Sequence, residues 1–206
     1  MKNLVNFRLL AYLVVFMLIG GLFPHLSNAE EFDNEEELKQ YEIDIEKMIS
    51  EVEPYVTVTN QGRFLLNPFT PKALRDKYDL DNLEVRLNEL NQEAEQGIIT
   101  ILSDKTIIQN VEVQGVTKTV KHWWGYTRYL NNKDTINAID QLREFDKDVK
   151  SSSTILKILK IPVLGFVASV VSNYGKLVAS RLEKNNKGNG TILSITWAMV
   201  FNVKAQ

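Results

Sequence analysis

The chain has 206 residues, of which 44% are hydrophobic and 24% are charged. This composition is typical of a globular protein, and it excludes both a disordered chain and a polytopic membrane protein. The absence of cysteine excludes disulfides, zinc–thiolate sites and thiol catalysis. The net charge of −2 hides an uneven distribution, because residues 30–53 carry −9 and residues 151–206 carry +6. Such asymmetry is informative about binding partners and says nothing about the fold.

Residues 1–29 have the layout of a secretory signal peptide. Lys2 and Arg8 supply positive charge, an apolar run of 15 residues follows at 9–23, and small residues lead to a cleavage position at Ala29. The run is shorter than the ~20 residues of a membrane-spanning helix. We therefore expect cleavage after Ala29 and a secreted mature protein, extracellular or associated with the cell surface.

The region 30–104 is predicted to be acidic and mainly helical, with one small hairpin. Pro54 and Gly97 are the residues expected to end its two longer helices. A short apolar run at the end of the region is ambiguous between a strand and a helix extension. In chain order, the expected elements are a helix at 34–53, hairpin strands at 55–59 and 63–66, helices at 72–78 and about 80–96, and the ambiguous run at 98–102.

The region 105–206 is predicted to be a C-terminal α+β region. Its expected elements are β-rich stretches at 105–113 and 116–126 joined at Gln114-Gly115, a helix that begins at 131–134, an apolar helical segment at 154–182 kinked or begun by Pro162, and a terminal strand at 191–203. Together the two regions predict an α+β fold, with a small, mainly antiparallel sheet covered by helices. One covering element is expected to be a strongly apolar C-terminal helix or helical hairpin.

Three motifs give the sequence a family resemblance. They are the segment 51–56 leading into 62–66, the Trp123-Trp124-Gly125 motif with Tyr129-Leu130 after it, and Gly188-Asn189-Gly190 before the terminal strand. Together they resemble small signal-peptide-bearing secreted proteins of Gram-positive bacteria, most of them without an assigned function. A more distant architectural likeness is to exported toxin or bacteriocin-like precursors with an apolar C-terminal segment. The resemblance implies secretion and assigns no catalytic residue.

A cationic apolar segment near the C-terminus is the first candidate functional site. Residues 161–175 carry no charge, and basic residues flank them on both sides. As a helix they span about 22 Å at ~1.5 Å per residue, less than the ~30 Å hydrocarbon core, although lysine side chains extend the reach. The segment either acts on anionic bacterial membranes or is a buried helix of a globular domain. Its residues are Lys157, Lys160, Ile161, Pro162, Leu164, Phe166, Val170, Lys176 and Arg181.

The acidic helix at 34–53 suggests an intramolecular mask for that segment. A mask requires the apolar stripe of the helix to pack on residues 154–182 until the segment is released. The alternative is a solvated acidic face, because salt screens charges on a protein surface.

The aromatic residues Trp123, Trp124 and Tyr126 are a second candidate site, one for binding by aromatic stacking. On a strand, the two tryptophans would face opposite sides of the sheet, which leaves one for a saccharide or a membrane interface. The alternative is that both are buried beneath helices. His122 is the only histidine that remains after cleavage, and one histidine does not make a metal site.

No catalytic signature is present, because the sequence lacks G-x-S-x-G, H-E-x-x-H, a P-loop and G-x-G-x-x-G. We expect no enzymatic activity, no metal, no cofactor and no nucleic-acid partner. The sequence predicts a secreted, non-enzymatic antagonist, bacteriocin-like or toxin-like, that acts at bacterial membranes through its cationic apolar segment. The alternative is an extracellular, cell-wall-associated binding module that uses the Trp-Trp strand. The expected partners are the bacterial membrane or the cell wall, with an immunity protein accompanying the antagonist function.

Overall fold

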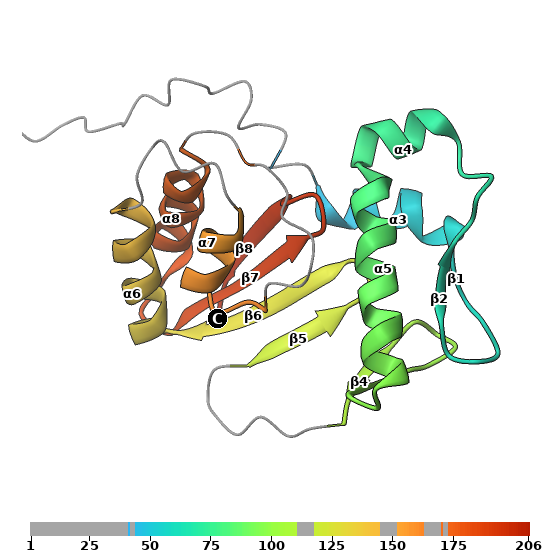
Figure 1. Cartoon of the computed structure of the whole chain (residues 1–206). Coiled ribbons are helices and arrows are strands. Elements are labelled where there is room, and N and C mark those ends of the chain that lie inside the picture. Colours follow the sequence, from blue (N-terminus) through green and yellow to red (C-terminus); the bar gives the residue numbers. More distant parts are fainter. Residues whose placement is uncertain (1–40, 42–43, 111–117, 145–151, 163–169, 171–172) are drawn as a thin grey trace, which may run out of the picture. The chain divides into compact units, whose positions relative to one another are not determined.

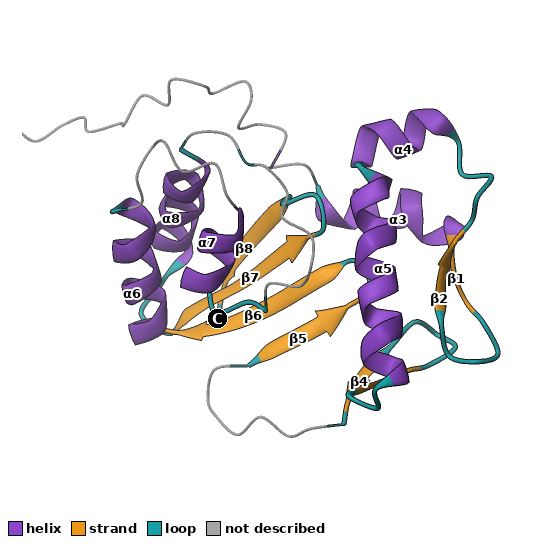
Figure 2. Cartoon of the chain, in the orientation of Figure 1, coloured by secondary structure: helices purple, strands orange, loops and turns teal. Residues whose placement is uncertain are grey.

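The computed structural model describes residue 41 and residues 44–110, 118–144, 152–162, 170 and 173–206, which all belong to the unit Asn34–Gln206. The predicted signal peptide with Ala29, the first half of the acidic helix, the Gln114-Gly115 junction, Leu164 and Phe166 lie outside the described residues. Figures 1 and 2 show the arrangement of the elements. In chain order they are α3 (Ile45–Val52), the 3-10 helix η2 (Glu53–Tyr55), β1 (Val56–Val58), β2 (Phe64–Leu66), α4 (Lys72–Tyr78), α5 (Leu80–Glu95), β3 (Ile99–Ile101), β4 (Ile107–Gln109), β5 (Thr119–His122), β6 (Gly125–Asn131), α6 (Asn132–Arg143), α7 (Ser152–Ile158), α8 (Tyr174–Asn185), β7 (Gly190–Thr196) and β8 (Phe201–Ala205).

The fold is α+β, as predicted, and every strand pair among the described residues is antiparallel. β1 pairs with β2 and β3 pairs with β4, whereas β5, β6, β7 and β8 form one four-stranded sheet in that order. The ambiguous run at 98–102 is therefore a strand, and the two predicted β-rich stretches do not pair with each other in their described parts. Each belongs to a different hairpin.

Local sequence signals mark the ends of helices α3, α4 and α5. The Asp44 carboxylate caps α3 by accepting from the backbone N–H groups of Glu46 and Lys47, and α3 gives way to η2 before Pro54. α4 matches its predicted range of 72–78. α5 ends two residues before Gly97, which has a φ of 73°. These boundaries confirm the predicted helices at 72–78 and about 80–96. The predicted helix at 34–53 is not continuous, because α3 begins only at Ile45, after the extended N-cap residue Asp44.

The predicted β-rich stretch at 116–126 is not one continuous strand: it contains β5 and the start of β6, because the chain turns at Trp123 and Trp124. These residues form the two-residue loop between β5 and β6, and His122 pairs with Gly125 across it. Gly125 has a φ of 147°, and a Cβ there would lie 2.0 Å from the Ile195 carbonyl oxygen. Only glycine fits this close approach of β6 to β7, so the turn is fixed at this position.

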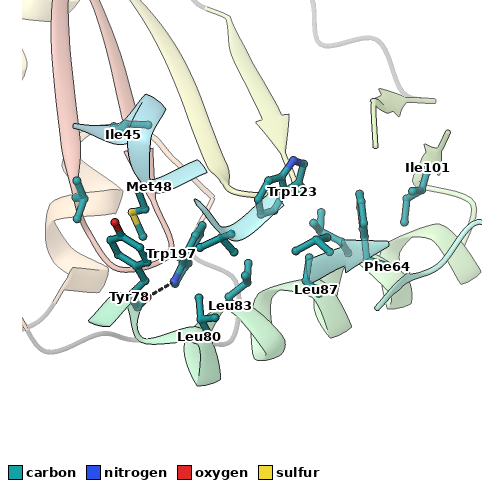
Figure 3. Close-up of a cluster of buried hydrophobic side chains, with 14 of the residues drawn as sticks. Ile45, Met48, Phe64, Tyr78, Leu80, Leu83, Leu87, Ile101, Trp123 and Trp197 are labelled. Carbon is teal, nitrogen blue, oxygen red and sulfur yellow. Dashed lines mark hydrogen bonds between the residues drawn. The ribbon is translucent and has the colours of Figure 1, made fainter. Parts of the chain in front are cut away.

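The predicted single strand at 191–203 is also wrong, because it is a hairpin of β7 and β8. The loop between them is closed by a hydrogen bond of 2.9 Å from the Thr196 N–H to the Val200 carbonyl, and Met199 has a φ of 59°. Trp197 inserts from this loop into the core, where its Nε1 donates to the Tyr78 carbonyl at 2.7 Å (Figure 3). The loop residues are buried in step with the strands, so the hydrophobic alternation continues through the turn.

The core around α5 joins the helix to the first hairpins and to both sheet turns (Figure 3). Leu80, Leu83 and Leu87 on α5 are buried against residues that include Phe64 on β2 and the Trp123 ring. On the four-stranded sheet, alternate residues are buried on one face, and helices α6 and α8 pack against these strands and against each other. On the opposite face, the side chains near the middle of the strands are exposed or half-buried, whereas Thr196 at the end of β7 is buried.

The predicted apolar segment at 154–182 comprises α7 and most of α8, with residues 163–169 and 171–172 outside the described part. α7 ends at a left-handed turn, in which Lys160 has a φ of 53° and the Ile161 N–H donates to the Leu156 carbonyl. Pro162 follows this turn and so lies outside α7. Within the part of the chain that the structure describes, no helix has the length and apolarity needed to cross a bilayer.

Candidate functional site

The face of the four-stranded sheet turned away from its buried side is the candidate functional surface. We call it the open face. Strand alternation places aromatic, hydroxyl and amide side chains there. Its residues are Val120, His122, Thr127, Tyr129, Ile192, Ser194, Asn202 and Lys204, each half-buried or exposed.

Trp124 and His122 form a stacked pair at the β5–β6 end of the open face. Their ring centroids are 4.4 Å apart and the rings are 4° from parallel. Both side chains are half-buried. Trp124 also packs against the core around α5, so the pair presents only part of its aromatic surface, and the two-residue turn fixes the position of that part.

The two other predicted aromatic candidates are buried and do not belong to this surface. Trp123 is directed into the core, where its ring stacks on Trp197 with 6.2 Å between centroids. Tyr126 lies on the buried side of β6, with the Arg86 guanidinium 4.5 Å from the centre of its ring. The expectation that the two tryptophans alternate across a strand is thus replaced by one buried and one surface tryptophan at a turn.

Hydroxyl groups continue the open face beside the aromatic pair. His122 Nε2 lies 3.0 Å from Thr127 Oγ1, and that oxygen lies 3.3 Å from Ser194 Oγ. Burial lowers the pKa of His122, and the positive charge of Arg86 adds to this effect. The imidazole is therefore neutral at pH 7, and the three groups offer uncharged hydrogen-bond donors and acceptors.

Catalysis and metal binding have little support in this arrangement. A histidine beside a hydroxyl is the geometry of a base and a nucleophile, but no described carboxylate is hydrogen-bonded to His122 to orient it. Among the residues that the structure describes, no group of three His, Asp or Glu side chains is placed to hold a metal ion.

The described residues of the candidate membrane segment fall into two groups. Ile161 and Val170 are buried, whereas Lys157, Lys160 and Pro162 are exposed. Lys160 also lies 3.6 Å from the Asp134 carboxylate on α6. On α8, Lys176 and Arg181 are half-buried. The apolar residues thus belong to the core beside the sheet, and the basic residues lie at its margin.

Among the described residues, Tyr41 links the acidic N-terminal segment to the apolar segment. Tyr41 packs edge-on against Tyr174, the first residue of α8, with 4.6 Å between ring centroids. The Tyr174 hydroxyl donates to the Met199 carbonyl at 2.6 Å, and its ring contacts Phe201. The stripe of α3 itself packs mainly in the core around α5. The described stripe residues of α3 therefore do not make the packing that a mask requires, and Tyr41 is the described stripe residue that contacts α8.

A surface hollow lies at the junction of α4 and α5. Its charged groups neutralise one another, because Lys72 pairs with Asp76 at 2.7 Å and Arg75 pairs with Asp81 at 2.8 Å. The hollow therefore offers little net charge to a ligand.

The chain as a whole matches no protein family, no curated protein and no solved structure.

Proposed function

We propose that the protein is a secreted binding module that binds a cell-wall saccharide on the open face around Trp124. The observation that carries this proposal is the half-exposed Trp124–His122 stack beside a line of uncharged hydroxyl groups. Sugar rings present apolar C–H faces that pack on aromatic rings, and their hydroxyls require fixed, uncharged hydrogen-bonding partners. The open face supplies both within one hairpin and its neighbouring strand.

The turn preorganises this surface. The Trp123 ring is anchored in the core, and only glycine fits at position 125, where β6 approaches β7 closely. The backbone on both sides of Trp124 is therefore held in place. A side chain held in its binding geometry loses little conformational entropy when a ligand binds. Trp124 is therefore the expected anchor, with Thr127 and Ser194 as hydrogen-bonding partners.

The test is sedimentation of the mature protein with purified bacterial cell wall, followed by tryptophan fluorescence with soluble wall fragments. Trp124→Ala is expected to weaken binding about tenfold, because it removes the stacking surface. Trp123 and Trp197 are buried, so a ligand-induced fluorescence shift should come from Trp124 and disappear in Trp124→Phe.

Phe69→Ala is the matched control, because Phe69 is an aromatic residue with 89% of its surface exposed outside the open face. It should bind as the unmodified protein does. Ser194→Ala should weaken binding without changing the thermal unfolding temperature by more than about 2 °C. Binding that is unchanged in Trp124→Ala would refute the proposal.

A membrane-active antagonist is the second candidate, and the Tyr41–Tyr174 contact is the observation that favours it. In this reading the apolar segment at 154–182 is held in the core by the N-terminal segment and reaches lipid only after it undocks. Lys157, Lys160, Lys176 and Arg181 would then meet anionic headgroups. The burial of Ile161 and Val170 means that undocking has to come first.

Dye release from vesicles that contain anionic lipid tests the second candidate. A chain that starts at residue 44 keeps the Asp44 cap and lacks Tyr41, so it is expected to release more dye than the chain that starts at residue 30. Lys160→Glu combined with Lys176→Glu should abolish the release, and Lys72→Glu on α4 should not. Equal release by the two chain lengths would end the masking hypothesis, and wall binding without release would favour the binding module.

A further inference from the structure

A buried polar layer lies between α5 and the strands β5 and β6. Arg86, Glu89 and Glu93 recur at three- and four-residue spacing along one side of α5, and they meet Lys121 and Tyr126 on the strands. Arg86 has only 1% of its surface exposed. A guanidinium group buried to this degree needs acceptors for its five N–H bonds.

Several hydrogen-bond donors of this layer have no acceptor among the described residues. No described residue accepts a hydrogen bond from Nε, Nη1 or Nη2 of Arg86. The same holds for the buried hydroxyl of Tyr126 and for Nε of Arg128, whose side chain is buried on the same face of β6. Buried donors without acceptors are rare and costly in proteins, and here several gather around one ring.

The nearby carboxylates do not supply the missing acceptors in this state. Glu93 is hydrogen-bonded to Lys121 at 2.6 Å. The Glu89 Oε2 atom lies 3.9 Å from Arg86 Nη1, which is within ion-pair range and beyond hydrogen-bond range. Burial raises the pKa of Tyr126 to about 12, so its hydroxyl keeps its proton and remains a donor. The layer thus combines a guanidinium fork with a phenol beside it, and neither is hydrogen-bonded to a carboxylate of the described residues.

We propose that this layer is a binding site for a small oxyanion, either a carboxylate or a phosphate group. The fork of Arg86 binds two oxygens of the anion, and the Tyr126 hydroxyl donates to one of them. Glu89 is the internal competitor for Arg86, and it turns away when the anion binds. The site lies on the buried side of the sheet, and its proposal does not rest on the sugar-binding proposal.

The thermal unfolding temperature of the mature protein, measured at constant ionic strength, tests this site. Sodium acetate, sulfate and phosphate are each compared with sodium chloride. At least one oxyanion is expected to raise the unfolding temperature by roughly 5 °C in a saturable manner. Comparison of the planar acetate with the two tetrahedral anions shows which class the site accepts.

Three variants locate the effect. Tyr126→Phe removes only the hydroxyl and should weaken the anion about fivefold, and Arg86→Lys should abolish the response. Glu89→Gln removes the competitor and should strengthen the anion about fivefold. Arg75→Gln, at a surface arginine paired with Asp81 and Glu84, is the control and should respond like the unmodified protein.

Three results would overturn the site. One is an unmodified protein that unfolds at the same temperature in oxyanion and in chloride, which would leave Arg86 to Glu89 or to water. A second is a response that survives in both Tyr126→Phe and Arg86→Lys, which would mark it as a general salt effect. The third is a Glu89→Gln protein that is destabilised and does not respond to oxyanion.

Discussion

At the scale of single residues, buried side chains complete hydrogen bonds that the backbone leaves open. Asn91 on α5 accepts from the Phe64 N–H at 2.7 Å and donates to the Phe64 carbonyl at 2.9 Å. One amide side chain therefore does for β2 what a neighbouring strand would do. Because both backbone groups are buried, their hydrogen bonds depend on this single side chain.

Replacement of Asn91 is expected to be costly for that reason. Asn91→Ala leaves a buried N–H and a buried carbonyl without partners, so we expect the free energy of unfolding to fall by about 2–4 kcal/mol. Urea unfolding measures this, with Gln92→Ala, at the exposed neighbouring position, as the control. A loss below about 0.5 kcal/mol would show that water replaces the side chain at no cost.

At the scale of elements, the helix ends and turns that proline or glycine marks are the ones that the sequence predicts well. Pro54 and Gly97 mark helix ends locally, and the predicted helices at 72–78 and about 80–96 are confirmed. The turns at Trp123-Trp124 and after Thr196 were missed because their bulky apolar residues resemble strand residues. Trp197 is buried in phase with the strand alternation, so no local pattern reveals its turn.

Of the two candidate sites, the sequence reveals the one around Trp124 and does not reveal the one around Arg86. Trp124 was among the predicted aromatic residues because an aromatic pair is visible in the sequence. Arg86 was missed, because on a helix it reads as one of many charged residues. Its ring partner Tyr126 belongs to a distant strand, and only tertiary packing brings the two together. A charged residue next to the apolar stripe of Leu83 and Leu87 is the one signal that was available.

The β5–β6 turn makes a prediction at the same scale. Gly125→Ala places a Cβ 2.0 Å from the Ile195 carbonyl oxygen, so β6 and β7 must separate, and we expect a loss of more than about 3 kcal/mol or no folding. Gly188→Ala is the control, because Gly188 also has a positive φ but its Cβ would meet no atom within 4 Å. It should cost about 1 kcal/mol. Similar thermal unfolding of the two variants would contradict the structure.

At the scale of the whole molecule, lysines from later in the chain partly neutralise the negative charge of the acidic N-terminal segment. Glu46 lies 3.5 Å from Lys204 on β8, Glu51 pairs with Lys77 at 2.8 Å, and Glu53 lies 3.3 Å from Lys105. These are largely exposed pairs, and salt screens them, so each adds little to stability. The charge asymmetry of the sequence is therefore moderated in the folded chain.

Two buried tyrosines predict how the molecule responds to alkali. Burial raises the pKa of Tyr126 to about 12, and it raises the pKa of Tyr174 well above its ordinary value. A tyrosine with a raised folded-state pKa contributes its full stability below pH ~10, and loses it as the pH rises toward the folded pKa. Tyr126 alone should then cost about 2–3 kcal/mol between pH 10 and 12.

Thermal unfolding measured from pH 8 to pH 12 tests this expectation. The unfolding temperature should be flat to about pH 10 and then fall, and the fall should be smaller in Tyr126→Phe. Tyr55→Phe is the control, because Tyr55 is a tyrosine that lies outside the buried core. An equally steep fall in Tyr126→Phe would mean that Tyr126 ionises freely in the folded protein.

The stacking of Trp123 on Trp197 has a spectroscopic consequence. Their rings are 25° from parallel and 6.2 Å apart, and they come from two different hairpin turns that meet against α5. Electronic transitions in two indoles this close couple with each other, so the native far-ultraviolet circular dichroism spectrum should contain an exciton couplet. Its amplitude reports whether the two turns are docked together, without any label attached to the chain.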